Sequence, residues 1–192
     1  MRRPGAALGV SKTMKINIKE CVKVLAAIVA LSMGQSAFAQ TTDDQVFTVT
    51  VPSLLSITAP ANRTIDTTTD QTDGNKVFTP ATSADHWAVT CNSVNGATVN
   101  LTALSPFVNG ASQRDAQLDL AIGSGATNWG VTVASDVTDY AGGTNTASVQ
   151  AQSSAPGDGG LALTVTFVNT TYADLTEGDY VMTVRGTISA NP

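Results

Sequence analysis

The sequence contains a single histidine, His86, which directly follows Asp85. An imidazole beside a carboxylate can act as a general base, because the carboxylate orients the ring and stabilises its protonated form. The chain has no Gly-x-Ser-x-Gly nucleophile motif, and it has no second histidine to complete the common zinc sites. We therefore interpret His86 as a surface residue at the start of a strand, and we predict no catalytic residue and no enzymatic activity.

Oxygen-bearing side chains gather in a polar stretch between residues 61 and 75. Asp66, Asp70, Asp73 and Asn75 could supply oxygen ligands to a calcium ion. They lack the Asp-x-Asp-x-Asp-Gly spacing that arranges ligands around one ion, and Asp and Asn are also typical of turns. The sequence predicts a solvated loop without a metal or cofactor here, and a calcium site at these four residues is the alternative.

Two tryptophans, Trp87 and Trp129, could stack on sugars if their rings faced solvent. Each alternates with small or aliphatic residues: Val89 and Cys91 for the first, Val131 and Val133 for the second. Side chains two apart in a strand share a face, so the alternation predicts that both rings are in the core. Glu177 is the only glutamate after residue 39, so the carboxylate pair of a glycosidase is not expected either.

Residues 1–39 have the pattern of a secretory signal peptide. Lysines precede an apolar run over 24–33, and Ala37-Phe38-Ala39 supplies the small residues that signal peptidase requires. The apolar run is about half the length of a membrane-spanning helix, which needs roughly 20 residues. The sequence predicts cleavage before Gln40, no membrane span in the mature chain, and a secreted, cell-surface or periplasmic location. Met14 is an alternative start, because 14–39 is already a complete signal.

Residues 40–192 carry four basic and fourteen acidic side chains, a formal charge of −10. Such a surface repels phosphate backbones and anionic lipid, so neither nucleic-acid binding nor membrane attachment is expected. Cys91 is the only cysteine of this part, because Cys21 belongs to the signal. No intrachain disulfide is therefore predicted, and the parity of Cys91 with Trp87 predicts a buried thiol.

Alternating apolar residues mark short strands separated by turn signals. These stretches are 46–51, 54–58, 76–78, 86–91, 97–103, 118–122, 129–133, 147–151, 161–167 and 180–188. Asn95-Gly96 and Gly123-Ser124-Gly125 predict hairpins between their flanking strands, and 156–160 predicts a flexible turn. The last two stretches predict a terminal hairpin over Leu161–Ile188.

The rhythm of these strands indicates the fold class. No ten-residue window after residue 39 shows sustained helical periodicity, and turn signals recur about every 8 to 12 residues. Residues 40–192 are therefore predicted to form one all-β domain, an antiparallel Ig-like sandwich of about nine or ten strands. An up-and-down barrel is the alternative, which the uneven loop lengths disfavour.

The stretch from Asp174 to Ile188 reads Asp-Leu-x-x-Gly-Asp-Tyr-Val-x-Thr-Val-x-Gly-Thr-Ile. It resembles the closing hairpin of secreted bacterial pilin-like sandwiches, including spore-coat-U-like surface proteins. The chain differs from chaperone-assembled pilins in having no cysteine pair after residue 39 and no penultimate aromatic residue. The resemblance implies a structural or adhesive subunit that associates with itself or with a surface partner. The alternative is a carbohydrate-binding module or a minor secreted hydrolase.

The segment from Thr41 to Val51 admits two interpretations. Its polar start is followed by Phe47, Val49 and Val51 on one face, which suits a strand donated to another subunit. It also suits an ordinary first strand of its own sandwich. Pro52 and Leu54 leave little linker before the next strand, so the ordinary first strand is the favoured interpretation.

Overall fold

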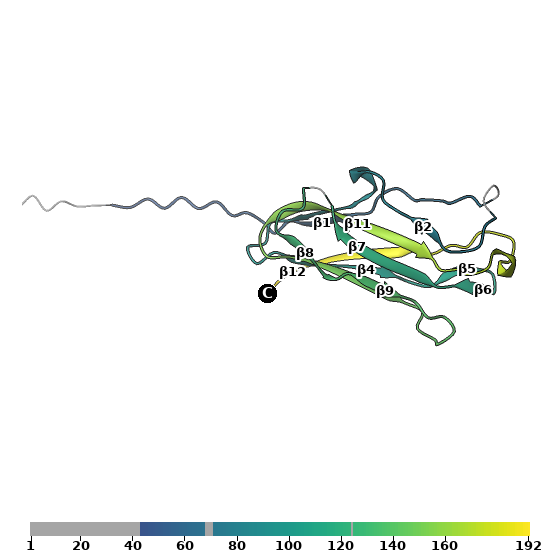
Figure 1. The fold of residues 1–192 in the computed structure, drawn as a ribbon. Helices are drawn as coiled ribbons and strands as arrows, with labels where there is room; N and C mark the ends of the chain where they lie inside the picture. The colour runs from purple at the N-terminus through teal and green to yellow at the C-terminus, as the bar shows by residue number, and fades with distance from the viewer. Residues whose placement is uncertain (1–42, 68–70, 124) are drawn as a thin grey trace, which may run out of the picture. The chain divides into compact units, whose positions relative to one another are not determined.

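The computed structural model describes residues 43–67, 71–123 and 125–192. The predicted signal peptide, residues 1–39, lies outside the described residues, as does Asp70 of the candidate calcium loop. Contacts divide the chain into two units, Met1–Val49 and Thr50–Pro192. All strands of the described residues lie in the second unit (Figure 1).

Short strands build this domain, as the alternation predicts. Twelve occur in the described residues: β1 (Leu55–Thr58), β2 (Lys76–Phe78), β3 (Trp87–Cys91), β4 (Ala97–Ala103), β5 (Phe107–Asn109), β6 (Ser112–Arg114), β7 (Ala116–Ile122), β8 (Trp129–Val133), β9 (Ser135–Val137), β10 (Ala147–Ser153), β11 (Gly157–Phe167) and β12 (Val184–Ala190). Two single turns of 3-10 helix, η1 (Ser83–Asp85) and η2 (Tyr172–Asp174), complete the elements. The number exceeds nine or ten because the three-residue strands β5, β6 and β9 were not among the predicted stretches.

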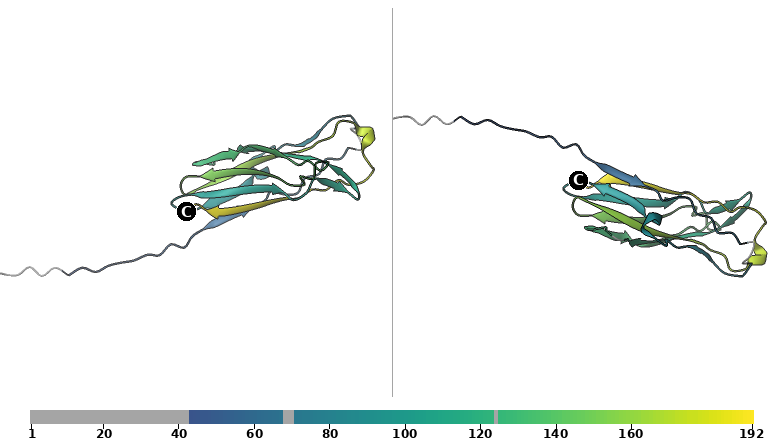
Figure 2. Two further views of the ribbon diagram at one scale, coloured as in Figure 1. Left: turned by 90° about the horizontal axis from the view of Figure 1, so that it is seen from below. Right: turned by 90° about the horizontal axis from the view of Figure 1, so that it is seen from above.

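The strands form two antiparallel sheets that pack as a sandwich (Figure 2). The six-stranded sheet has the order β1-β3-β11-β7-β9, and β2 also pairs with β11. The four-stranded sheet has the order β12-β4-β10-β8, and β5 and β6 form a separate hairpin. The predicted all-β sandwich is confirmed, and the barrel alternative is wrong.

The core lies between the sheets and follows the period of two. In β4 every second residue is buried, from Ala97 to Ala103, and β10 shows the same alternation. Trp87 and Trp129 are 8% and 7% exposed, so both rings belong to the core as predicted. Cys91 is 3% exposed and carries a free thiol, which confirms its predicted burial.

A smaller aromatic cluster forms a second core. The rings of Phe107 and Phe167 meet edge to face at 5.1 Å, and Tyr180 meets Phe167 in the same way at 5.3 Å. Phe78 stacks on Phe107 at 6.1 Å. These residues come from β2, β5, β11 and the segment before β12, so the cluster holds these elements together.

The three predicted hairpins are wrong, and all for the same reason. The strands on either side of Asn95-Gly96, β3 and β4, lie in different sheets. The same holds for β7 and β8 around Gly123-Ser124-Gly125, and for β11 and β12 at the end of the chain. Alternation shows which face of a strand is buried, but it does not identify the neighbouring strand. Each connection therefore crosses from one sheet to the other.

The predicted flexible turn over 156–160 is also wrong, because β11 begins at Gly157. Its glycines allow close contacts on both faces of the strand. A Cβ at Gly159 would lie 2.7 Å from the Cβ of Ala126, and one at Gly160 would lie 3.0 Å from His86 Nδ1. Close packing, and not flexibility, accounts for glycine at these positions.

Candidate functional site

The first candidate site is the free edge of β12. β12 pairs with β4 on one side, and no strand of the described residues pairs with its other side. β1 is the edge strand of the opposite sheet, and it contacts β12 (Figure 2). Four half-buried apolar side chains, which we call the seam, line this side of the sandwich: Leu55, Ile57, Val184 and Ile188. An edge of this kind offers free backbone groups beside apolar side chains.

A glycine on the inner face of β12 brings the two sheets close together at the seam. A Cβ at Gly186 would lie 2.6 Å from Trp87 Cζ3 and 2.7 Å from Ile57 Cδ1. The Trp87 ring and the Ile57 side chain therefore fill the space over Gly186. A side chain at this position would push β12 away from β1, so this glycine of the Asp174–Ile188 motif is explained by packing.

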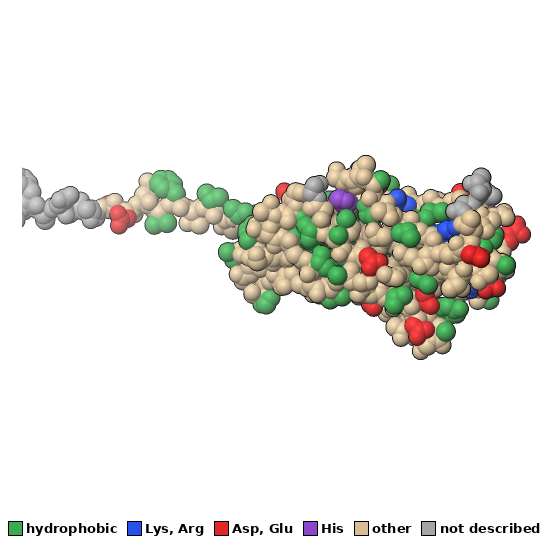
Figure 3. Space-filling view, viewed as in Figure 1, with side chains coloured by type: hydrophobic (Ala, Val, Ile, Leu, Met, Phe, Trp, Pro, Cys, Tyr) green, Lys and Arg blue, Asp and Glu red, His purple; other side chains and the backbone are tan. Residues whose placement is uncertain are grey.

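The segment before β1 has the opposite character, with apolar side chains but no pairing. Residues 43–54 form no strand, turn or bend. The exposed fractions are 84% for Val46, 82% for Phe47, 87% for Val49 and 74% for Val51. Figure 3 shows hydrophobic side chains along this segment. Residues 46–51 form no strand in this structure, so the predicted strand over this stretch is wrong. The choice between an ordinary first strand and a donated strand stays a prediction.

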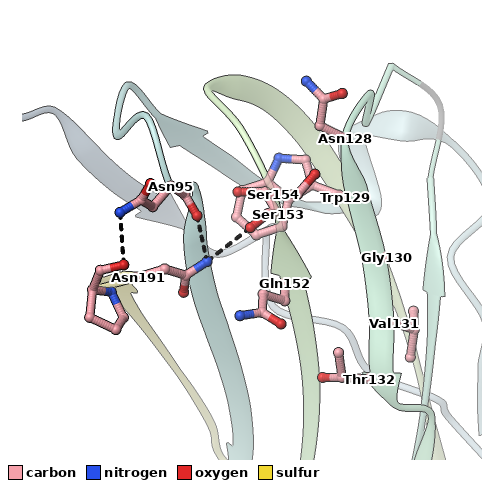
Figure 4. A pocket seen from close by; sticks show the side chains of 11 residues that line it. Asn95, Asn128, Trp129, Gly130, Val131, Thr132, Gln152, Ser153, Ser154 and Asn191 are labelled. Atoms are coloured by element: carbon pink, nitrogen blue, oxygen red, sulfur yellow. Dashed lines mark hydrogen bonds between the residues drawn. The ribbon is translucent and has the colours of Figure 1, made fainter.

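The second candidate site is a recess where the C-terminus meets β8 and β10. Its volume is about 830 Å³, and polar side chains make up most of its wall, which also includes Trp129 (Figure 4). Most of the amides are already bonded within the chain. Asn95 Nδ2 donates to the Pro192 carbonyl at 2.7 Å, and Asn191 Nδ2 donates to the carbonyls of Asn95 and Ser153, each at 2.9 Å. The Asn95 and Asn191 amides therefore hold the C-terminal residues in place, and they are not free to bind a ligand.

The tryptophan in this wall does not present a surface for stacking. Trp129 is 7% exposed, and its Nε1 is buried without a hydrogen-bond partner. Its Cδ1 lies against β11, 3.1 Å from where a Cβ at Gly159 would be. The indole is thus directed into the sandwich, so a sugar entering the recess would meet amide and hydroxyl groups but no aromatic face.

His86 and Asp85 do not act as a pair. Asp85 Oδ2 accepts bonds from the backbone N–H groups of Ala81 and Thr82, each at 2.9 Å. These backbone bonds, from Thr82 first and Ala81 second, lower the pKa of Asp85 below its ordinary value of 3.8. His86 lies against Gly123 and Gly160, with Nδ1 buried and without a hydrogen-bond partner. The carboxylate therefore caps η1 and does not orient an imidazole for catalysis.

The candidate calcium ligands connect two loops. Asp73 Oδ1 accepts a bond from the Tyr172 N–H at 2.7 Å, and Asn75 Oδ1 accepts one from the Asn169 N–H at 2.9 Å. Asp66 also has an interaction within the chain. Within the described ranges, no three His, Cys, Asp or Glu side chains are placed to hold a metal ion. The two oxygens with identified partners hold the loop before β2 against the connection that leads to β12.

Sequence reasoning missed the free edge of β12, since alternation does not show whether a strand has one neighbour or two. It also missed Asn92, whose side chain holds the backbone before β1; an Asn directly after a strand is the only signal for it.

In the described part of the chain, no helix is long and apolar enough to cross a membrane. No family model, no curated protein and no solved structure matches this chain.

Proposed function

We propose that this protein is a secreted structural subunit of the cell surface, an Ig-like sandwich whose copies associate by strand addition. The segment 46–51 of one copy pairs with the free edge of β12 in another copy. One observation carries the proposal: the described residues contain both an exposed, alternating apolar segment and an unpaired strand edge beside half-buried apolar side chains. Each supplies what the other lacks, since an added strand gains backbone hydrogen bonds from the edge and covers its side chains.

The dimensions of the two partners agree. Six residues in extended conformation span roughly 20 Å at about 3.3 Å per residue. β12 has seven residues, Val184–Ala190, so one segment can cover nearly the whole edge. Phe47, Val49 and Val51 share one face of the segment and would lie over the seam. The alternation of the donor thus fits the spacing of the acceptor.

The energetics require both the side chains and the backbone. Burying three large apolar side chains contributes roughly 5–9 kcal/mol. Association of two proteins costs an estimated 4–15 kcal/mol in lost freedom. The free energy gained by burying the side chains therefore roughly offsets the cost of association. The added ladder of backbone hydrogen bonds must supply the net affinity. This requirement favours an extended segment over a general hydrophobic contact.

Charge contributes to the match. Asp43 and Asp44 precede the segment 46–51, whereas β12 carries Arg185, an exposed residue and one of four basic residues in 40–192. Acidic side chains are spread over the face shown in Figure 3, and basic ones are few. The two acidic residues that precede the segment are therefore attracted to β12 more than to most of the surface.

The carbohydrate-binding alternative has weaker support. Sugar recognition by stacking requires exposed aromatic faces, and both tryptophans are more than nine-tenths buried. Among the described residues, the amide-walled recess could still bind a glycan, but the Asn95 and Asn191 amides are already bonded within the chain. A glycan-binding screen of the full chain tests this alternative directly.

A peptide experiment tests the proposal. A labelled peptide of residues 43–53 is added to the full chain, and binding is followed by fluorescence anisotropy. The control peptide carries Phe47→Asp and Val49→Asp, which keep its length and break its apolar face. We expect the native peptide to bind and to reduce assembly measured by light scattering, and the control to do neither. A chain that is monomeric at all concentrations and does not bind the peptide would overturn the proposal.

A further inference from the structure

Asn92, the residue after β3, holds the backbone that precedes β1. Its Oδ1 accepts a bond from the Leu54 N–H at 2.6 Å, and its Nδ2 donates to the Pro52 carbonyl at 2.8 Å. Its own N–H donates to the Leu54 carbonyl at 3.1 Å. The side chain therefore extends the β1–β3 ladder past its last pair, Leu55 and Cys91, at a place where Pro52 has no N–H to offer.

The topology gives this contact a consequence. β1 begins opposite Cys91, and β12 ends at Ala190, opposite Ala97. Cys91 and Ala97 are joined by the short connection 92–96, so the start of β1 and the end of β12 lie at the same end of the sandwich (Figure 2). A segment that reaches this end and then enters β1 would have to reverse direction at 52–54 in order to lie along its own β12.

The residues that would make this reversal are the ones that Asn92 holds. Both peptide groups that flank Ser53 are bonded to the Asn92 side chain, and residues 52–54 form neither turn nor bend. A tight reversal needs these groups to rotate away from β3. While the contact persists, residues 52–54 do not form the tight reversal that pairing with the β12 of the same chain would require.

We propose that Asn92 is a positioning residue that prevents the segment 46–51 from pairing with its own β12 and so reserves it for a second copy. This inference rests on the proposed function, because it concerns which copy receives the strand. Loss of the contact frees 52–54 to turn, and the segment then closes its own edge in a parallel arrangement beside β12. Such a closed monomer has neither a free strand nor a free edge.

The test compares Asn92→Ala with Asn95→Ala in the full chain. Both residues are exposed and lie in the connection 92–96, but Asn95 bonds to Pro192 and not to residues 52–54. Hydrogen exchange of the amides of 46–51 is measured in the monomer fraction, and assembly is measured by size exclusion with light scattering. We expect Asn92→Ala to slow exchange in this segment at least tenfold and to raise the concentration needed for assembly at least tenfold. Asn95→Ala is expected to behave like the unaltered chain.

A second variant guards against misfolding of the first. Asn92→Asp keeps an acceptor for the Leu54 N–H but removes the donor to the Pro52 carbonyl, so an intermediate protection is expected. If both Asn92 variants assemble like the unaltered chain and keep a rapidly exchanging segment, the inference is overturned. If the unaltered chain never assembles, the proposed function fails, and so does the claim that the segment is reserved for a second copy. Exchange then decides only whether Asn92 keeps the segment from its own β12: protection in Asn92→Ala supports that role, and rapid exchange overturns it.

Discussion

Single residues in this domain determine how closely two parts of the chain can approach each other. Gly96 is a clear case, because its φ is +75° and a Cβ there would lie 2.1 Å from the Ser153 carbonyl oxygen. The same residue accepts a bond from the Asn191 N–H, which places the end of the chain. Asn95-Gly96 was predicted to make a hairpin turn; the glycine is required here, but for an arch between sheets that passes close to β10.

We predict that Gly96→Ala destabilises the fold far more than Gly143→Ala. Both glycines have positive φ, but nothing lies within 4 Å of a Cβ at Gly143. The control variant Gly143→Ala therefore loses only about 1–2 kcal/mol in the free energy of unfolding, through backbone strain. Gly96→Ala adds a clash with a backbone oxygen, and we expect a total loss of roughly 2–5 kcal/mol in the free energy of unfolding. Urea denaturation measures both, and equal losses would contradict the close approach.

For the strands, the sequence predicted which face of each strand is buried, but it did not predict which strands pair with each other. The buried faces of β3, β4 and β10 follow from alternation, because side chains at i and i+2 must share a face. Pairing depends on contacts between residues far apart in the chain, such as Val89 with Gly159. The free edge of β12 could not be predicted for the same reason, since an edge is defined by a missing neighbour.

The segment 46–51 provides the test at this scale. We predict that Val49→Asp strongly weakens assembly while Thr48→Asp does not, because successive side chains of a strand point to opposite faces. Burying an unpaired carboxylate costs at least about 2 kcal/mol, so affinity should fall by roughly thirtyfold or more. Val49 is 87% exposed, and neither variant should change the melting temperature. Equal effects of the two substitutions on light scattering would argue against strand pairing.

For the whole molecule, net charge and assembly oppose each other. Residues 40–192 carry a formal charge of −10, so copies repel one another at long range. Near physiological ionic strength, salt screens the repulsion between charges that are more than about 8–10 Å apart. The short-range backbone and apolar contacts of an added strand are little affected by salt. We therefore expect copies of this chain to remain monomeric unless a specific contact, such as the proposed strand addition, outweighs the repulsion.

Deleting residues 40–51 decides whether the segment belongs to its own domain or to another copy. We predict a folded monomer whose melting temperature lies within about 2 °C of the full chain, because the removed apolar side chains bury little surface in their own domain. The deleted chain should no longer assemble, but it should still bind the peptide of residues 43–53, since β12 keeps its free edge. Calorimetry, light scattering and anisotropy measure the three properties. A destabilised or insoluble product would instead show that the segment completes its own sandwich, and monomeric behaviour of both chains would reduce it to a tether.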